Sequence, residues 1–147
     1  MITNKIKVAI LYNETDPTQY KKFKITKNNT PEFIPYFELE NLSPIDEFNI
    51  IKEKIAKQGY DVYIFNMQDN FYALIENLKK EKPDVIFNFV EIFNNQPKLE
   101  MNIAGIFELM KIPYTGASAI ALANCQNKIL TKRILRTARI KTPDFQI

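Results

Sequence analysis

Histidine is absent from this 147-residue sequence, cysteine occurs once, and glycine occurs only three times. Without histidine the chain lacks the usual general base and the commonest metal ligand, which excludes histidine triads and His/Cys zinc sites. The single cysteine, Cys125, cannot form an internal disulfide. The glycines, at Gly59, Gly105 and Gly116, are too scattered for a glycine-rich dinucleotide or phosphate loop. A self-contained nucleotide-binding domain is therefore disfavoured.

Long apolar runs are also missing. No stretch approaches the ~20 apolar residues of a membrane span, and residues Met1 to Lys7 lack the apolar segment and cleavage site of an export signal. We therefore expect a soluble, cytoplasmic protein with no membrane partner. With 46% hydrophobic and 25% charged residues, the composition is typical of one globular domain with a core of its own. Cys125 lies in a stretch of small residues and is expected to be a buried thiol.

Positive charge is concentrated near the C-terminus. Residues 127–141 contain six lysines and arginines and no acid, and since the whole chain carries +3, the remainder carries −3. So small a total does not indicate a nucleic-acid partner, and a solvated helix face explains the basic segment. Lysines and aromatics alternate in Tyr20–Asn29, where a solvated loop is favoured over a nucleic-acid surface. The helix expected over residues 127–139 should pack inward through Ile129, Leu130, Ile134 and Leu135.

Three short apolar runs, Ile6–Leu11, Asp61–Phe65 and Asp84–Val90, predict buried strands. A helical pattern separates each from the next. The first helix should begin at Ser43, a capping residue followed by Pro44, and the second should end before Pro83. Their inner faces are expected to carry Ile45, Phe48, Ile51 and Ile55 in the first, and Phe71, Leu74, Ile75 and Leu78 in the second. This alternation predicts an α/β fold: a three-layer, Rossmann-like domain with a mostly parallel sheet.

Two segments interrupt the alternation. Glu14–Leu42 is polar, contains three prolines and has no sustained period, which is typical of a functional or mobile loop. Residues 94–97 form a shorter break before a further helix. Glu91 directly follows the third strand, at the sheet edge where ligands of parallel sheets bind. Its carboxylate either faces a substrate or belongs to a surface loop.

The run GIFELMKIPYTG, from Gly105 to Gly116, carries the most specific pattern in the chain. Together with the small-residue stretch after it, the pair Asn127-Lys128 and the later Thr142-Pro143, it resembles the D-alanine:D-alanine ligases of the ATP-grasp superfamily. KVAILYN and KPDVIFNFVE resemble the first and third strands of that family's N-terminal domain. The resemblance implies a pre-ATP-grasp domain over residues 1–126 and the start of an ATP-grasp module over 127–147.

Such ligases activate a carboxylate as an acyl phosphate, with ATP and Mg²⁺, and join it to an amine. In the family the magnesium-binding acids, the glycine-rich phosphate loop and the adenine pocket lie beyond the position matched by Ile147. The resemblance therefore implies that this chain supplies no catalytic residue and no metal ligand, holds no cofactor by itself and is inert alone. An amino acid or small carboxylate is the implied substrate, and a homodimer is left open.

Five residues match functional positions of the family. Lys128 corresponds to a lysine that contacts the ATP phosphates. Glu91 and Glu100 fall where the family places polar residues that organise the substrate, and Asp46 or Glu47 lies near the helix start that receives the substrate ammonium. The family's His-Gly and Gly-Glu-Asp-Gly patterns are replaced here, so D-alanine itself is not implied. A second hypothesis is a non-enzymatic module that binds a small ligand or a protein through the 14–42 loop.

Overall fold

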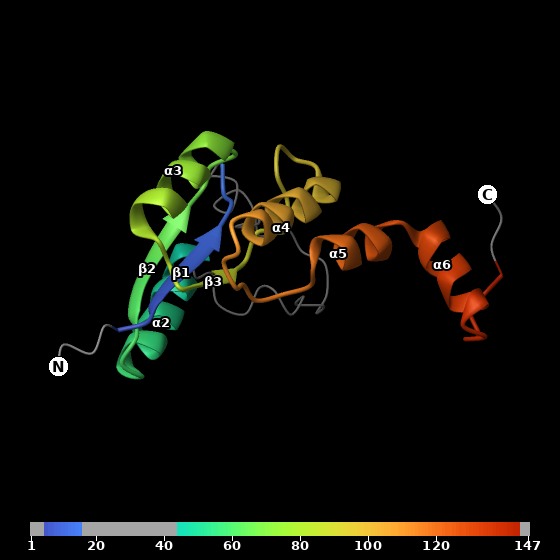
Figure 1. Cartoon of the computed structure of the whole chain (residues 1–147), viewed down its shortest axis with the longest axis horizontal. Coiled ribbons are helices and arrows are strands. Elements are labelled where there is room, and N and C mark those ends of the chain that lie inside the picture. The colour runs from blue at the N-terminus through green and yellow to red at the C-terminus, as the bar shows by residue number, and fades with distance from the viewer. Residues whose placement is uncertain (1–4, 16–43, 145–147) are drawn as a thin grey trace, which may run out of the picture.

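The structure, a computed structural model, describes residues 5–15 and 44–144. Its centre is a parallel three-stranded sheet in the order β2-β1-β3 (Figure 1). The strands are β1 (Lys7–Tyr12), β2 (Asp61–Asn66) and β3 (Val85–Asn88). Lys7 lies opposite Asp61 in one ladder, and Val8 lies opposite Val85 in the other. The earliest strand in the sequence therefore lies between the two later ones.

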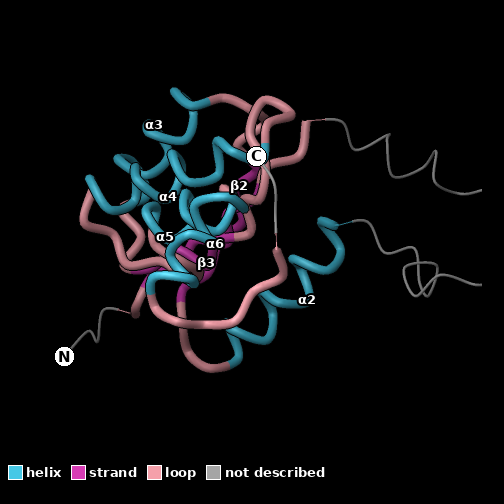
Figure 2. The backbone as a smooth tube through the Cα atoms, turned by 90° about the vertical axis from the view of Figure 1, so that its right-hand side faces the viewer, coloured by secondary structure: helices cyan, strands magenta, loops and turns pink. Residues whose placement is uncertain are grey.

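Helices cover both faces of this sheet. Successive side chains of β1 point to opposite faces, so each helix layer contacts alternate residues of that strand. Ala9 and Leu11 pack with α3 (Phe71–Glu81) and α4 (Glu100–Leu109), whereas Val8 and Ile10 pack with α2 (Pro44–Lys57). Figure 2 shows α2 on one side of the strands and α3 with α4 on the other. The predicted three-layer α/β fold is confirmed.

The first two helices end as the sequence suggests. Gly59, just after α2, has φ +96°, and Lys82 takes a left-handed φ of +46° where α3 stops. Asn70 caps α3, since its Oδ1 accepts a hydrogen bond from the Ala73 N–H at 3.0 Å. The predicted cap at Ser43 and residues 16–42 of the predicted loop lie outside the described residues.

The chain after α4 extends the sheet beyond β3. Ile86 N donates to Pro113 O at 2.8 Å, and Thr115 N donates to Ile86 O at 2.9 Å. The Thr115 hydroxyl also accepts from Asn88 N at 3.0 Å. Gly116 then turns the chain with φ +112°, a conformation that L side chains rarely adopt. These contacts explain the Pro-Tyr-Thr-Gly part of the sequence motif, because its residues pair with β3 and then turn the chain toward α5.

Two glycines of that motif should respond in opposite directions to alanine. Gly116→Ala is expected to lower the free energy of unfolding by about 1–2 kcal/mol, because its φ is left-handed. Gly105→Ala should raise it by up to about 1 kcal/mol, since a helix-interior glycine is replaced. A Cβ at Gly105 would meet only the Ala119 Cβ, at 3.8 Å. Urea unfolding measures both, and a shift of the same sign in both variants would contradict the assignment.

The two last helices, α5 (Ala119–Gln126) and α6 (Lys128–Thr137), lead away from the sheet (Figure 1). Two predictions fail here. Cys125 is exposed rather than buried. Ile129, Leu130 and Ile134, expected to pack inward, are 37–46% exposed because α6 packs on α5 and not on the sheet. None of the helices described is long and apolar enough to cross a membrane.

Candidate functional site

Glu91 lies at the carboxyl edge of the sheet, on the segment that follows β3, and its side chain is exposed. Two residues earlier, the Phe89 ring packs against Phe48 of α2, with ring centroids 4.9 Å apart. Phe48 in turn contacts Tyr12, the last residue of β1, at 4.6 Å. These ring contacts place the segment leading to Glu91 near the first turns of α2.

Glu100 opens α4, directly after the 3-10 turn η2 (Pro97–Leu99), and is partly buried. Its Oε2 accepts a hydrogen bond from Gln126 Nε2 at 3.0 Å, and the same amide group donates to Pro97 O at 3.0 Å. Burial raises the pKa of Glu100; the Gln126 hydrogen bond opposes that shift, and the negative charge of Glu91 adds to it. The negative charge of Glu91, at the carboxyl edge of the sheet, thus acts on the Glu100 carboxyl at the start of α4.

Lys128 lines a groove of about 790 Å³ between the start of α4 and the junction of α5 with α6. Its side chain is exposed at the first position of α6. Asn127 caps this helix, since its Oδ1 accepts from Leu130 N at 3.0 Å. A lysine beside the N–H groups of a helix start is a favourable arrangement for an anion. Gln126 and Lys98 line the same groove, so its polar side holds both charge and hydrogen-bond donors.

Asp46 and Glu47 are placed differently. Both are exposed in the first turn of α2, which covers the sheet face opposite to α4. The acidic pair of α2 therefore belongs to the other layer from Glu100. Of the five residues singled out in the sequence, Glu91 acts on Glu100 through its charge, and Lys128 shares a groove with the partner of Glu100.

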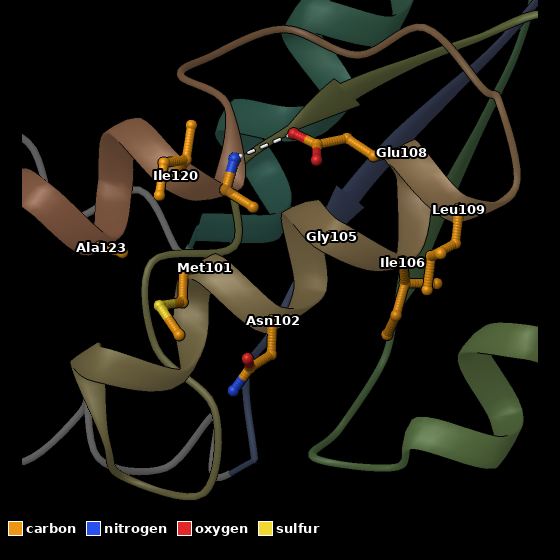
Figure 3. A pocket seen from close by; sticks show the side chains of 9 residues that line it. Met101, Asn102, Gly105, Ile106, Glu108, Leu109, Ile120 and Ala123 are labelled. Carbon is orange, nitrogen blue, oxygen red and sulfur yellow. Dashed lines mark hydrogen bonds between the residues drawn. The ribbon is translucent and has the colours of Figure 1, made fainter.

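A second groove, of about 640 Å³, runs between α4 and α5 (Figure 3). Its lining is mostly apolar and includes Met101, Ile106, Leu109 and Ile120. At its edge the Glu108 carboxylate accepts from Ala119 N at 2.9 Å and from the Tyr114 hydroxyl at 2.7 Å. These hydrogen bonds lower the pKa of Glu108. Burial, followed by the hydrogen bond and the charge of Glu108, raises the pKa of Tyr114 to about 12. This contact joins α4 to the start of α5.

Gln126 is the site residue that the sequence did not reveal. It joins the last turn of α5 to the start of α4 across 26 residues of sequence, and neither helix shows a pattern that pairs the two ends. Its only signal is its position two residues before Lys128. Within the described residues, no group of three or more His, Cys, Asp or Glu side chains is placed to hold a metal ion.

Replacing Glu100 with glutamine should stabilise the domain at neutral pH. The raised pKa means that the native state binds protons more tightly than the unfolded state, so wild-type stability falls as pH rises above about 4.5. Glutamine keeps an oxygen for Gln126 and carries no charge. The melting temperature of Glu100→Gln should therefore exceed that of the wild type increasingly between pH 4.5 and 7. Glu76→Gln, an exposed change on α3, is the control; a pH-independent difference for Glu100→Gln would contradict the expectation.

Known proteins similar to this chain are D-alanine–D-alanine ligases, although no family model matches it. The ligase of Carboxydothermus hydrogenoformans is 36% identical over 91 residues, which are 62% of this chain and 27% of that ligase. The ligase of Pelagibacter ubique is 33% identical over 106 residues, covering 72% of this chain and 33% of that ligase.

A solved structure, the D-alanine–D-alanine ligase of Bacillus anthracis complexed with ATP, superimposes on this chain with a TM-score of 0.58 at 20% identity. The match covers 97% of this chain and 38% of that one, and it shows the same fold. The chain thus spans about a third of the length of the curated relatives it matches. These relatives and the solved structure are all D-alanine–D-alanine ligases; the sequence similarity supports a ligase-like family for this chain, and the superposition shows the fold that they share.

Proposed function

We propose that this chain is the N-terminal domain of an ATP-dependent carboxylate–amine ligase. Residues 1–126 would form the pre-ATP-grasp domain, and 127–147 would begin the ATP-grasp module. The observation that carries the proposal is the convergence of Glu91, Glu100 and Gln126 with the Lys128 groove, in a chain whose relatives are ligases. Such a domain would act in the cytoplasm on an amino acid or small carboxylate.

The side chains of the site fit two parts of such a reaction. The Lys128 ammonium and the first N–H groups of α6 would neutralise and orient the ATP phosphates, as a lysine point charge does in many phosphate sites. Glu91 and Glu100 would accept hydrogen bonds from the ammonium of an amino substrate. Asp46 and Glu47 are a second candidate pair for this role, from the opposite layer.

ATP and magnesium would be bound by different residues. Lys128 and the α6 start fit one end of a polyphosphate. A bound magnesium ion would supply neutralisation of the charge on the phosphates. The family resemblance implies that its ligands belong to the ATP-grasp module and not to residues 1–126. Because phosphoryl transfer needs bound magnesium, we expect a polypeptide without those ligands to hydrolyse no ATP.

An NMR titration of the ¹⁵N-labelled chain tests the proposal. Addition of D-alanine should shift the amide resonances of residues 91–102, and inorganic tripolyphosphate, a probe for the phosphate groups alone, should shift those of residues 126–130. The amides of α3, on the same sheet face but away from the site, serve as the internal reference. If neither ligand at millimolar concentration shifts these segments, or if the shifts fall only within residues 16–43, the proposal is wrong. The second of those outcomes would favour a binding module that uses the long loop.

A further inference from the structure

Two tight turns follow β2 and β3 at the carboxyl edge of the sheet. In the first, Asn70 N donates to Met67 O at 2.8 Å, and in the second, Gln96 N donates to Phe93 O at 2.9 Å. Positive φ at both central positions, together with this hydrogen bond, is the pattern of a type I′ turn. The central residues, with φ between +49° and +56°, are Gln68, Asp69, Asn94 and Asn95.

One side-chain pair joins these turns to each other and to the end of β1. Asp69 Oδ1 accepts from Asn94 N at 2.7 Å and from Asn13 Nδ2 at 2.6 Å. Asn13 Nδ2 also donates to Ile92 O at 2.8 Å, and Asn13 Oδ1 accepts from Asp69 N at 2.8 Å. We call this pair the Asn13–Asp69 clamp. It connects the segments that follow all three strands.

The clamp opposes a conformational cost. Left-handed φ disfavours most residues other than glycine, although asparagine and aspartate tolerate it better than the rest, and such conformations persist where the surroundings over-determine them. Three of the four turn centres are asparagine or aspartate, one is glutamine and none is glycine. The strands already hold their register through the backbone ladders. What the clamp adds is the placement of residues 91–96, the segment that leads from Glu91 to η2 and Glu100.

We propose that Asn13 and Asp69 are positioning residues, which fix the 91–96 segment through Ile92 and Asn94 and thereby set where Glu91 lies relative to Glu100, at the other end of the same connection. A role of the two glutamates in substrate binding rests on the proposed function. The effect of the clamp on the geometry of the two glutamates is independent of that function, and it is tested without a ligand.

The test measures whether Glu91 still acts on Glu100 when the clamp is broken. ¹³C NMR gives the pKa of the Glu100 carboxyl in the wild type and in each clamp variant, with and without Glu91→Gln. The change in that pKa caused by Glu91→Gln is the coupling between the two glutamates, and comparing it between the wild type and a clamp variant is a double-mutant cycle. In the wild type, Glu91→Gln should lower the pKa of Glu100. Asp69→Ala removes the acceptor of both hydrogen bonds and should abolish this change. Asp69→Asn keeps an oxygen of the same shape, and the change should persist.

Two further variants separate positioning from stability. Asn70→Ala removes the cap of α3 from the same turn and should lower the melting temperature of the domain, yet it should leave the coupling intact. Asn13→Ala breaks the link to β1 and Ile92; it should abolish the coupling, and it replaces Asp69→Ala if that variant does not fold.

The outcomes are distinct. Three results would overturn the role of the clamp. The coupling could persist in folded Asp69→Ala and Asn13→Ala, it could be lost equally in Asn70→Ala, or it could be absent from the wild type. If the coupling is lost as expected but neither D-alanine nor tripolyphosphate shifts its segment, 91–102 or 126–130, in the wild type, the clamp stands and the proposed function fails.

Discussion

Replacement of Lys128 by alanine is expected to weaken the binding of inorganic tripolyphosphate to this chain, and of MgATP to the full-length enzyme, about ten- to a hundredfold. A hydrogen bond to a charged group contributes about 1.5–3 kcal/mol, which corresponds to that range in affinity. Lys128 lines the groove and is exposed, so it can reach a phosphate without leaving a packed position. The N–H groups at the start of α6 remain in the variant, and they should preserve weak binding. Isothermal titration or the NMR shifts of residues 126–130 measure the change.

Lys132→Ala is the matched control. Lys132 shares the helix and the charge but lies one turn further on, outside the groove lining, and its ammonium donates to Pro143 O at 2.8 Å. We expect it to leave polyphosphate affinity nearly unchanged. Lys128→Ala should alter the free energy of unfolding by less than about 0.5 kcal/mol, as exposed substitutions usually do. Equal losses of affinity in the two variants, or a lowered melting temperature with unchanged affinity in Lys128→Ala, would assign Lys128 to the surface or the fold.

Phe107→Ala should produce the largest loss of stability in the chain, about 3–5 kcal/mol. The Phe107 side chain is 0% exposed in the core between α4 and the sheet, and its ring packs on Tyr114 with centroids 5.3 Å apart. Domains of this kind have a total stability of about 5–15 kcal/mol, so the variant loses a large part of it. Urea unfolding followed by circular dichroism gives the value.

Leu109→Ala, two residues further along α4, is the comparison for that experiment. Leu109 is 84% exposed, so its removal should change the free energy of unfolding by less than about 0.5 kcal/mol. A loss below 1 kcal/mol in Phe107→Ala, or a similar loss in both variants, would mean that α4 does not pack on the sheet as described. Because Glu100 lies on α4, such a result would also displace the candidate site.

The elements of the fold could be predicted from the sequence because apolar periodicity and helix signals are local. Strand order and register could not, since they depend on pairs such as Val8 and Val85 that are distant in the chain. The third strand was predicted to reach Val90 but ends at Asn88. The reason is a side chain: Asn88 Oδ1 accepts from Val90 N at 3.1 Å.

The site was predictable only in part, for a similar reason. Family resemblance predicts Lys128 and Glu100 one at a time, as candidates, whereas Gln126 and the Asn13–Asp69 clamp are defined by contacts between distant segments. The amphipathic pattern of α6 indicates that one helix face favours an apolar neighbour. The pattern does not indicate which element supplies that neighbour. In the structure the neighbour of α6 is α5 rather than the sheet.

The central position of β1 has a consequence for synthesis. Lys7–Tyr12 leaves the ribosome before both of its partners, and in the finished domain all but its first residue is buried. Until Asp61–Asn66 and Val85–Asn88 have emerged, this apolar segment has two unpaired edges, the kind of surface that associates with other chains. We expect the nascent chain to need chaperone cover at its N-terminus until β3 is released, after which the sheet can close around β1.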